Sequence, residues 1–162
     1  MLEIRPAREA DQSAIVQLWH QGWHDAHAHL VPTEILAFRT PAYFSLWLKQ
    51  TTDVFHVAIT DELLGFVSIN GAELVKLYVS PQARGSGTAH DLLSHAEHLL
   101  SEQGVVEAEL FCTAGNVRAQ RFYAREGWRL SRTFEDALWL PENIAGRFTV
   151  ETHCYQKHLG LR

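Results

Sequence analysis

The pattern of apolar and polar residues predicts a chain in which strands and helices alternate. Glu73 to Val79 alternates and is rich in β-branched and aromatic residues, as strands are, and Pro81 ends this stretch because proline cannot donate to a strand ladder. From Ala89 to Leu100 the apolar residues recur at helical spacing, and Gly104 ends that helix. The chain is therefore expected to be organised around a central strand that leads through a short turn into a helix.

The same criteria predict the remaining elements. Strands are expected at Leu2–Pro6, Val54–Thr60, Leu63–Asn70, Val106–Thr113, Trp128–Thr133 and Phe148–Lys157, with a loop from Glu135 to Gly146 before the last of them. Helices are expected after an Asp11 cap, at Thr33–Arg39, at Ala42–Gln50 behind the Thr40-Pro41 start signal, and between an Asn116 cap and Gly127. This order predicts an α/β (α+β) fold with a mixed, mostly antiparallel sheet flanked by helices.

The turn between the central strand and its helix contains two glycines and an arginine, in the order Gln82 to Thr88. The first amides of a helix have no intrahelical acceptor, and glycine lets a ligand approach the backbone, so this turn can surround a phosphate. A tight bend without a ligand is the alternative. The turn lacks the Gly-Lys-Ser/Thr of a Walker loop, and Gly85 and Gly87 do not continue into G-x-G-x-x-G, which disfavours P-loop and Rossmann proteins.

Composition narrows the class of protein. The 162 residues are 46% hydrophobic and 20% charged, which predicts a single domain over residues 1–162 with a substantial core. The net charge of -5 argues against a general nucleic-acid surface. Two cysteines make neither a disulfide framework nor a metal quartet. Without a secretory pattern at the N-terminus or a membrane-length apolar run, the expectation is a cytoplasmic protein with free thiols.

Two motifs resemble the GCN5-related N-acetyltransferase (GNAT) superfamily. Gln82 to Gly87 is similar to its Q/R-x-x-G-x-G/A signature, and Asn116 to Trp128 is similar to its N-x-x-A-x-x-F-Y-x-x-x-G-F segment, with Trp128 at the usual Phe. The resemblance is firm from Leu63 to Arg129 because both motifs occur in the right order. It implies a GNAT-like sheet and an acetyl-CoA-dependent N-acetyltransferase in which a primary amine attacks the thioester directly.

The resemblance also implies where acetyl-CoA binds as co-substrate. Its pantetheine arm would pair with the exposed backbone of the central strand, and its pyrophosphate would lie in the glycine turn. Asn116 would contact the arm or cap its helix, while Arg121 and Arg125 would approach the adenosine phosphates or remain solvated. The implied cofactor-binding residues are Leu77, Tyr78, Val79, Gln82, Arg84, Gly85, Ser86, Gly87, Thr88, Asn116, Ala119 and Phe122.

Two residues are the candidate catalytic groups. Tyr123 matches the family position that often serves as general acid, and a phenol with an ordinary pKa of about 10 is protonated at neutral pH; the alternative is a packed aromatic side chain. Glu73 matches a carboxylate that serves as base in several members, and the alternative is a solvated strand end. Strand alternation places Glu73 on the face of Leu77 and Val79 unless a bulge intervenes.

A cluster of histidines follows the first helical pattern, at His20, His24, His27 and His29. Their spacing allows a shared helical face, as metal ligands require, but no H-E-x-x-H or neighbouring thiolate is present, so no metal is expected. The resemblance implies instead that this region borders the acceptor pocket, with Trp23, His24 and His27 as substrate-binding candidates and the histidines as a second source of a base. Solvated or packed side chains are the alternative.

The expected partners follow from these features. The acceptor would be a small-molecule amine or a peptide N-terminus, with no nucleic acid and no membrane, and a homodimer is common among similar proteins. A function from another class also fits the glycine turn, namely a non-catalytic CoA-binding sensor or partner-binding module. The presence of Tyr123 and both glycines favours the enzyme.

Overall fold

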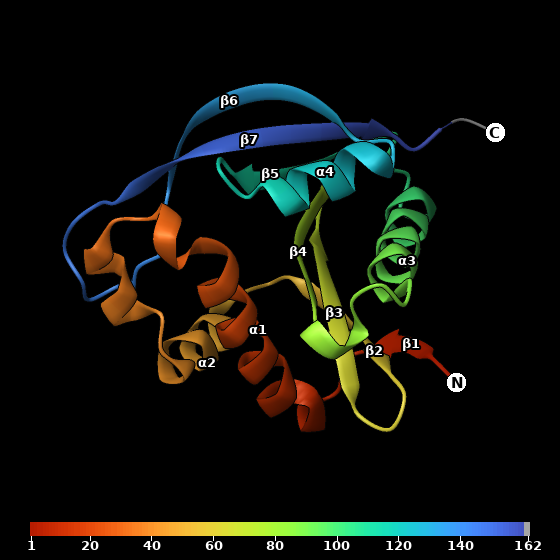
Figure 1. Cartoon of the computed structure of the whole chain (residues 1–162), viewed down its shortest axis with the longest axis horizontal. Helices are drawn as coiled ribbons and strands as arrows, with labels where there is room; N and C mark the ends of the chain where they lie inside the picture. Colours follow the sequence, from red (N-terminus) through yellow and green to blue (C-terminus); the bar gives the residue numbers. More distant parts are fainter. Residues whose placement is uncertain (161–162) are drawn as a thin grey trace.

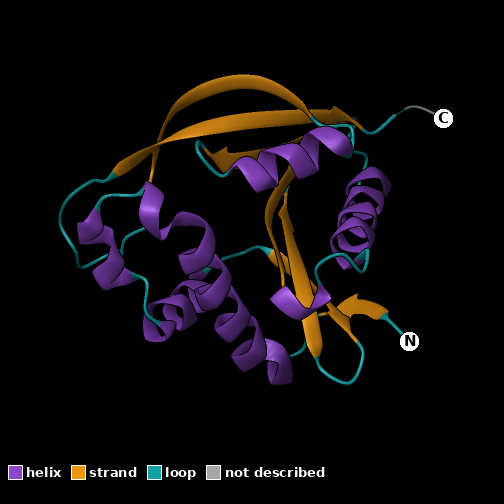
Figure 2. Cartoon of the chain, viewed as in Figure 1, coloured by secondary structure: helices purple, strands orange, loops and turns teal. Residues whose placement is uncertain are grey.

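A seven-stranded sheet runs through the computed structural model, which describes residues 1–160, in the order β1-β2-β3-β4-β5-β7-β6 (Figures 1 and 2). The strands are β1 (Glu3–Pro6), β2 (Val54–Ile59), β3 (Leu63–Asn70), β4 (Glu73–Val79), β5 (Glu107–Thr113), β6 (Arg129–Ala137) and β7 (Thr149–His158). Among the described strands only β4 and β5 pair in parallel, and every other pair is antiparallel. The predicted mixed, mostly antiparallel sheet is confirmed. The last two residues of the predicted domain, 161 and 162, lie outside the described residues.

Helices cover both faces of this sheet (Figure 1). The α-helices are α1 (Gln12–His27), α2 (Pro41–Gln50), α3 (Thr88–Glu102) and α4 (Val117–Arg125), and short 3-10 turns are η1 (Glu9–Asp11), η2 (Ala28–Leu30), η3 (Thr33–Phe38) and η4 (Pro81–Ala83). One apolar cluster joins the sheet to α3 and α4 around Leu92, Leu110 and Trp128. A second joins the opposite face to α1 and α2 around Trp19 and Phe44. No helix in residues 1–160 has the length and apolarity needed to cross a membrane.

Strands β4 and β5 are paired at only one position, Glu73 opposite Glu109, supported by a bond from the Glu109 amide to the Ala72 carbonyl (3.1 Å). Beyond it the two strands run in different directions (Figure 1). On its other edge β4 pairs with β3, where the Ser80 amide donates to the Leu64 carbonyl (2.8 Å). Because hydrogen-bonding direction alternates along an antiparallel strand, the main-chain groups of Leu77 and Val79 point into the gap.

A β-bulge interrupts β4 at Val75. Ser68 of β3 lies opposite Lys76, but the next residue, Ile69, lies opposite Leu74, so Val75 is the extra residue. The bulge reverses the alternation after it, which places Glu73 on the face of Lys76 and Tyr78 and not on the face of Leu77. Burial agrees, since Leu74 and Leu77 belong to the apolar cluster of α3 and Tyr78 to that of α1.

Two local predictions need correction. Residues 135–137 belong to β6 and not to a loop, because they pair with residues 149–151 of β7. Asp11 does not cap α1 with its side chain; its carboxylate accepts the Arg8 amide (2.7 Å) and pairs with Arg5 (2.7 Å), which closes the turn η1. By contrast, Thr40 caps α2 as expected, with its hydroxyl accepting the Tyr43 amide (3.3 Å).

Candidate active site

The turn before α3 presents free backbone amides to solvent. Gly85 and Gly87 have φ angles of +80° and +89°, which residues with a Cβ atom rarely adopt. A Cβ added at either glycine would meet no atom within 4 Å, so the surface of the turn is open. Within residues 1–160 the amides of Gly85, Gly87 and Thr88 have no hydrogen-bond acceptor. This arrangement suits an anion, as the sequence predicted.

The side chains of the turn divide into two groups. The Ser86 hydroxyl donates to the Ala83 carbonyl and accepts from the Thr88 hydroxyl (2.8 Å), so both hydroxyls hold the shape of the turn. The side chains of Gln82 and Arg84 are exposed beside it. A ligand in the turn would therefore meet backbone amides and the Arg84 charge and not the two hydroxyl protons.

Tyr123 reaches the core beside the gap from α4. Its ring contacts those of Phe122, Trp128 and Tyr155 at centroid distances of 5.3, 6.3 and 6.5 Å. Burial, followed by Cys112 and Tyr78, raises the pKa of its phenol far above the ordinary value, so the phenol is protonated across the physiological range. Within the described chain the phenol has no hydrogen-bond partner, which leaves it available to a ligand.

The helix that carries Tyr123 starts at a side-chain cap. The Asn116 side-chain oxygen accepts the Ala119 amide (3.3 Å), which confirms the capping role considered from the sequence. Ala119 and Phe122 pack against the apolar cluster of α3.

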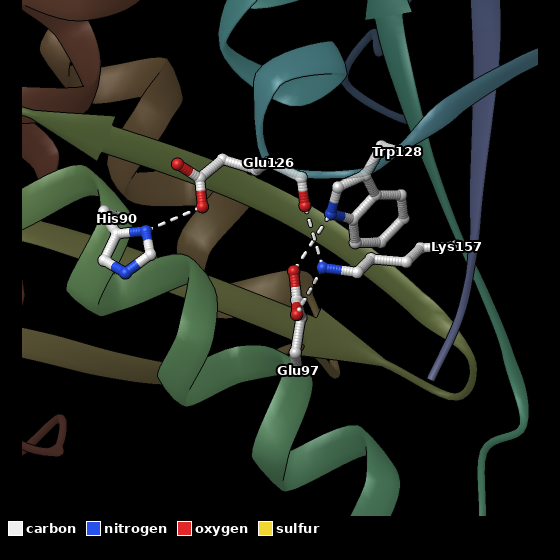
Figure 3. A network of polar contacts seen from close by, with 5 residues as sticks. All are labelled: His90, Glu97, Glu126, Trp128 and Lys157. Carbon is white, nitrogen blue, oxygen red and sulfur yellow. Dashed lines mark hydrogen bonds and ion pairs between the residues drawn. The ribbon is translucent and has the colours of Figure 1, made fainter. Parts of the chain in front are cut away.

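A network of polar contacts fixes the other end of α4 (Figure 3). Glu97 of α3 accepts from the Trp128 indole (3.0 Å) and from the Lys157 ammonium of β7 (2.9 Å). Lys157 also donates to the Glu126 carbonyl (2.8 Å), and His90 donates to the Glu126 carboxylate (2.7 Å). Because Glu126 and Trp128 directly follow α4, the network holds this helix against α3 and β7.

Glu97→Ala is expected to lower the free energy of unfolding by about 1–2 kcal/mol, because the indole and the ammonium each lose an acceptor in a partly buried place. Thermal or urea unfolding measures the change. Glu102→Ala is the matched control on the same helix: its exposed ion pair with His98 predicts a change below about 0.5 kcal/mol. Equal losses in the two variants would contradict a structural role for the network.

A cavity of about 200 Å³ lies on the α1 side of the gap. Its walls come from α1, η2–η3, α2, β4, β5 and the segment after β6, and they comprise Trp19, Trp23, His27, Val31, Trp47, Val75, Lys76, Tyr78, Phe111, Thr113 and Leu138. Gly22 makes this packing possible, since a Cβ there would lie 2.5 Å from the Tyr78 ring. Burial raises the pKa of the Tyr78 phenol far above the ordinary value.

The histidines of α1 have separate positions. His27 lines the cavity, and burial lowers its pKa to about 4, so it is neutral at pH 7. His24 donates instead to the Arg39 carbonyl (2.7 Å), and its ring lies 4.6 Å from that of His20. Of the three predicted acceptor contacts, Trp23 and His27 therefore line the cavity and His24 does not. No group of three metal-ligating side chains occurs within residues 1–160.

Glu73 lies at the closed end of the gap, where β4 and β5 still pair. Burial, aided by the charges of Asp53, Glu109 and Asp136, raises the pKa of its carboxyl to about 7, and Lys76 opposes the shift. A carboxyl with this pKa exists in both protonation states near neutral pH, as a general base should.

Two cationic residues of the site were missed from the sequence. Lys76 lines the cavity, pairs with Asp53 (3.1 Å) and lies 5.0 Å from the Trp19 ring. Arg39 is buried among Trp23, Trp47 and Trp139. No local pattern identifies either residue, because their partners are distant in the chain.

Comparison with known proteins agrees with this geometry. Residues 13–128 match the model of the acetyltransferase (GNAT) family. The spermidine N(1)-acetyltransferase of Thermoplasma acidophilum is 22% identical over 154 residues, covering 82% of this chain and 91% of the relative.

Two solved structures share the fold. A GCN5-related N-acetyltransferase from Rhodopseudomonas palustris has a TM-score of 0.73 at 17% identity, covering 96% of this chain and 94% of that one. An N-acetyltransferase from Thermoplasma acidophilum, solved in complex with coenzyme A, has a TM-score of 0.64 at 20% identity, covering 94% and 98%. The chain belongs to the acetyltransferase (GNAT) family.

Proposed function

We propose that this protein transfers the acetyl group of acetyl-CoA to a primary amine by direct attack of the amine on the thioester. The observation that carries the proposal is the alignment of three features along one gap: free amides at its mouth, unpaired main-chain groups of Leu77 and Val79 along its edge, and the Tyr123 phenol beside it. Family membership and a structural neighbour that binds coenzyme A support it.

In this proposal the turn from Gln82 to Thr88 binds the pyrophosphate through its amides, and Arg84 adds charge-assisted contacts. The pantetheine arm pairs with the main chain of Leu77 and Val79, in the position an adjacent strand would otherwise take. Asn116, Ala119 and Phe122 lie on the α4 side of this path.

The chemistry is assigned to two side chains. The amine nitrogen attacks the thioester carbonyl, so that a C–N bond forms and the C–S bond breaks. Tyr123 gives its phenolic proton to the departing thiolate and regains one from solvent, while Glu73 takes the proton lost by the amine, directly or through water. His27 is a poorer base, because its pKa of about 4 makes it a weak proton acceptor.

Direct attack is favoured over a covalent acetyl-enzyme. The Cys112 thiol acts electrostatically on the phenols of Tyr78 and Tyr123, so it is the candidate nucleophile of this site. Burial raises the pKa of this thiol to about 11. A thiol with this pKa is almost entirely protonated at pH 7, whereas the thiolate is the nucleophilic form.

Isothermal titration of acetyl-CoA tests the cofactor site. Gly87→Ala is expected to weaken binding about tenfold, because an alanine disfavours by roughly 1–2 kcal/mol the positive φ of the turn conformation that presents the amides to the ligand. Gly71→Ala is the matched control: Gly71 also has a positive φ (+59°) and open space, but it lies in the β3–β4 turn, at the opposite end of β4 from the glycine turn.

A thiol-release assay over a panel of amines completes the test. Absence of acetyl-CoA binding by the wild-type protein would refute the proposed function. Binding without release of CoA for any amine would assign the chain to the other class considered from the sequence, a CoA-binding module without catalysis.

A further inference from the structure

We infer that the acceptor amine also carries a carboxylate, as an amino acid does, and that Arg39 and His27 recognise this carboxylate at the cavity beside α1. The inference rests on the proposed function and names the acceptor class for the same site.

Arg39 is a buried cation without a counterion. Its residue is 1% exposed, and among the described residues no carboxylate lies within 4.0 Å of it. Within residues 1–160 the guanidinium donates only to the neighbouring Phe38 carbonyl (3.2 Å), and its Nε has no partner. A buried charge of this kind is costly, and polar groups in protein interiors are normally satisfied. The site therefore has an unused donor and an unbalanced positive charge.

Aromatic rings hold this charge in place without neutralising it. The Arg39 guanidinium lies 5.2, 5.1 and 5.8 Å from the ring centres of Trp23, Trp47 and Trp139. Trp47 and Trp139 stack on each other at 4.8 Å, which joins α2 to the segment after β6. Such cation–π contacts offset part of the desolvation cost. A bound anion can offset the rest of this desolvation cost.

The charge lies next to the cavity. Trp23 and Trp47 belong both to the group around Arg39 and to the cavity wall. Arg39 also acts electrostatically on Tyr78 and His27, which line the same cavity. The buried Nδ1 of His27 has no close hydrogen-bond partner, only a weak interaction with the Trp23 carbonyl. The cavity wall thus includes His27 with its unpartnered nitrogen, and the Arg39 guanidinium lies behind two indole rings of the same wall, those of Trp23 and Trp47.

The rest of the cavity wall suits an acceptor with a compact apolar side chain and not a polyamine. No acidic residue lines the cavity, and its one lysine, Lys76, is already neutralised by Asp53. Glu73 is on the same face of the sheet and is assigned to the amine proton. A polyamine would bring at least one further ammonium group, for which the cavity wall itself has no carboxylate. The volume of about 200 Å³ is that of an amino-acid-sized ligand.

Matched acceptors test the inference with the wild-type protein and saturating acetyl-CoA. L-phenylalanine is compared with 2-phenylethylamine and L-phenylalaninamide, L-leucine with 3-methylbutylamine, and all with spermidine, by release of free CoA. The expected kcat/KM is about 10- to 100-fold higher for the amino acids, which is the range of charge-assisted hydrogen bonds. Equal or better use of the decarboxylated amines or of spermidine overturns the inference. If no amine is used at all, the proposed function fails instead.

The variant Arg39→Gln tests whether Arg39 recognises the acceptor carboxylate or only stabilises the fold. The variant is expected to raise KM at least about tenfold for the amino acid, with little change in KM for 2-phenylethylamine or in acetyl-CoA affinity. An equal rise for both acceptors contradicts recognition of the carboxylate. If Arg39→Gln fails to fold, Arg39→Lys keeps the charge and should give a smaller rise confined to the amino acid, and the comparison of wild-type acceptors decides in either case.

Discussion

Tyr123→Phe is expected to lower kcat about 100-fold or more, the usual contribution of a general acid, while the affinity for acetyl-CoA stays within about twofold. The phenol is buried and protonated, and no residue of the described part of the chain hydrogen-bonds to it, so its removal takes away the proton for the departing thiolate and little else. Steady-state release of CoA and titration calorimetry measure the two quantities.

Tyr155→Phe is the matched control for this variant. Its ring packs 6.5 Å from that of Tyr123 in the same apolar cluster, and burial also raises the pKa of its phenol. Loss of this hydroxyl should leave turnover nearly unchanged. Full activity in Tyr123→Phe, or equal losses in both variants, would remove Tyr123 from the mechanism.

Glu73→Gln is expected to abolish the acid limb of the pH–rate profile. Because the carboxyl has a pKa of about 7 and must be ionised to accept a proton, wild-type kcat/KM should rise about tenfold per pH unit below that value and level off above it. The variant should be at least about 100-fold less active at pH 8 and lack this limb. Glu109→Gln removes a neighbouring like charge and should shift the limb to lower pH, because Glu109 helps to raise the pKa of Glu73.

Measurements of stability distinguish the role of Glu73 as a general base from a structural role. The folded state holds the Glu73 proton more tightly than the unfolded state, whose pKa is near 4.5. Its contribution to stability is therefore greatest below that pH and is lost as the pH rises through about 7. Glu73→Gln should accordingly be at least as stable as the wild type at pH 8, measured by thermal unfolding. A clear loss of stability, or a retained acid limb, would contradict the role of Glu73 as base.

The sequence alone was sufficient for most of the helices and strands and for the open glycine turn, because their signals are local. Pro81 and the two glycines act on the backbone within a few residues, and Asn116 caps the helix that begins beside it. The helix after the turn follows the periodicity of its own residues. Such features depend on spacing, which the sequence contains directly.

The tertiary structure decided which side chains meet. The bulge at Val75 depends on the register of β4 against β3, and it alone places Glu73 with Lys76 and Tyr78. Only the packing of α1, α2 and the segment after β6 surrounds Arg39 with indole rings and brings His27 to the cavity. These arrangements join residues far apart in the chain through burial and strand register, and no periodicity or motif in the sequence specifies such contacts.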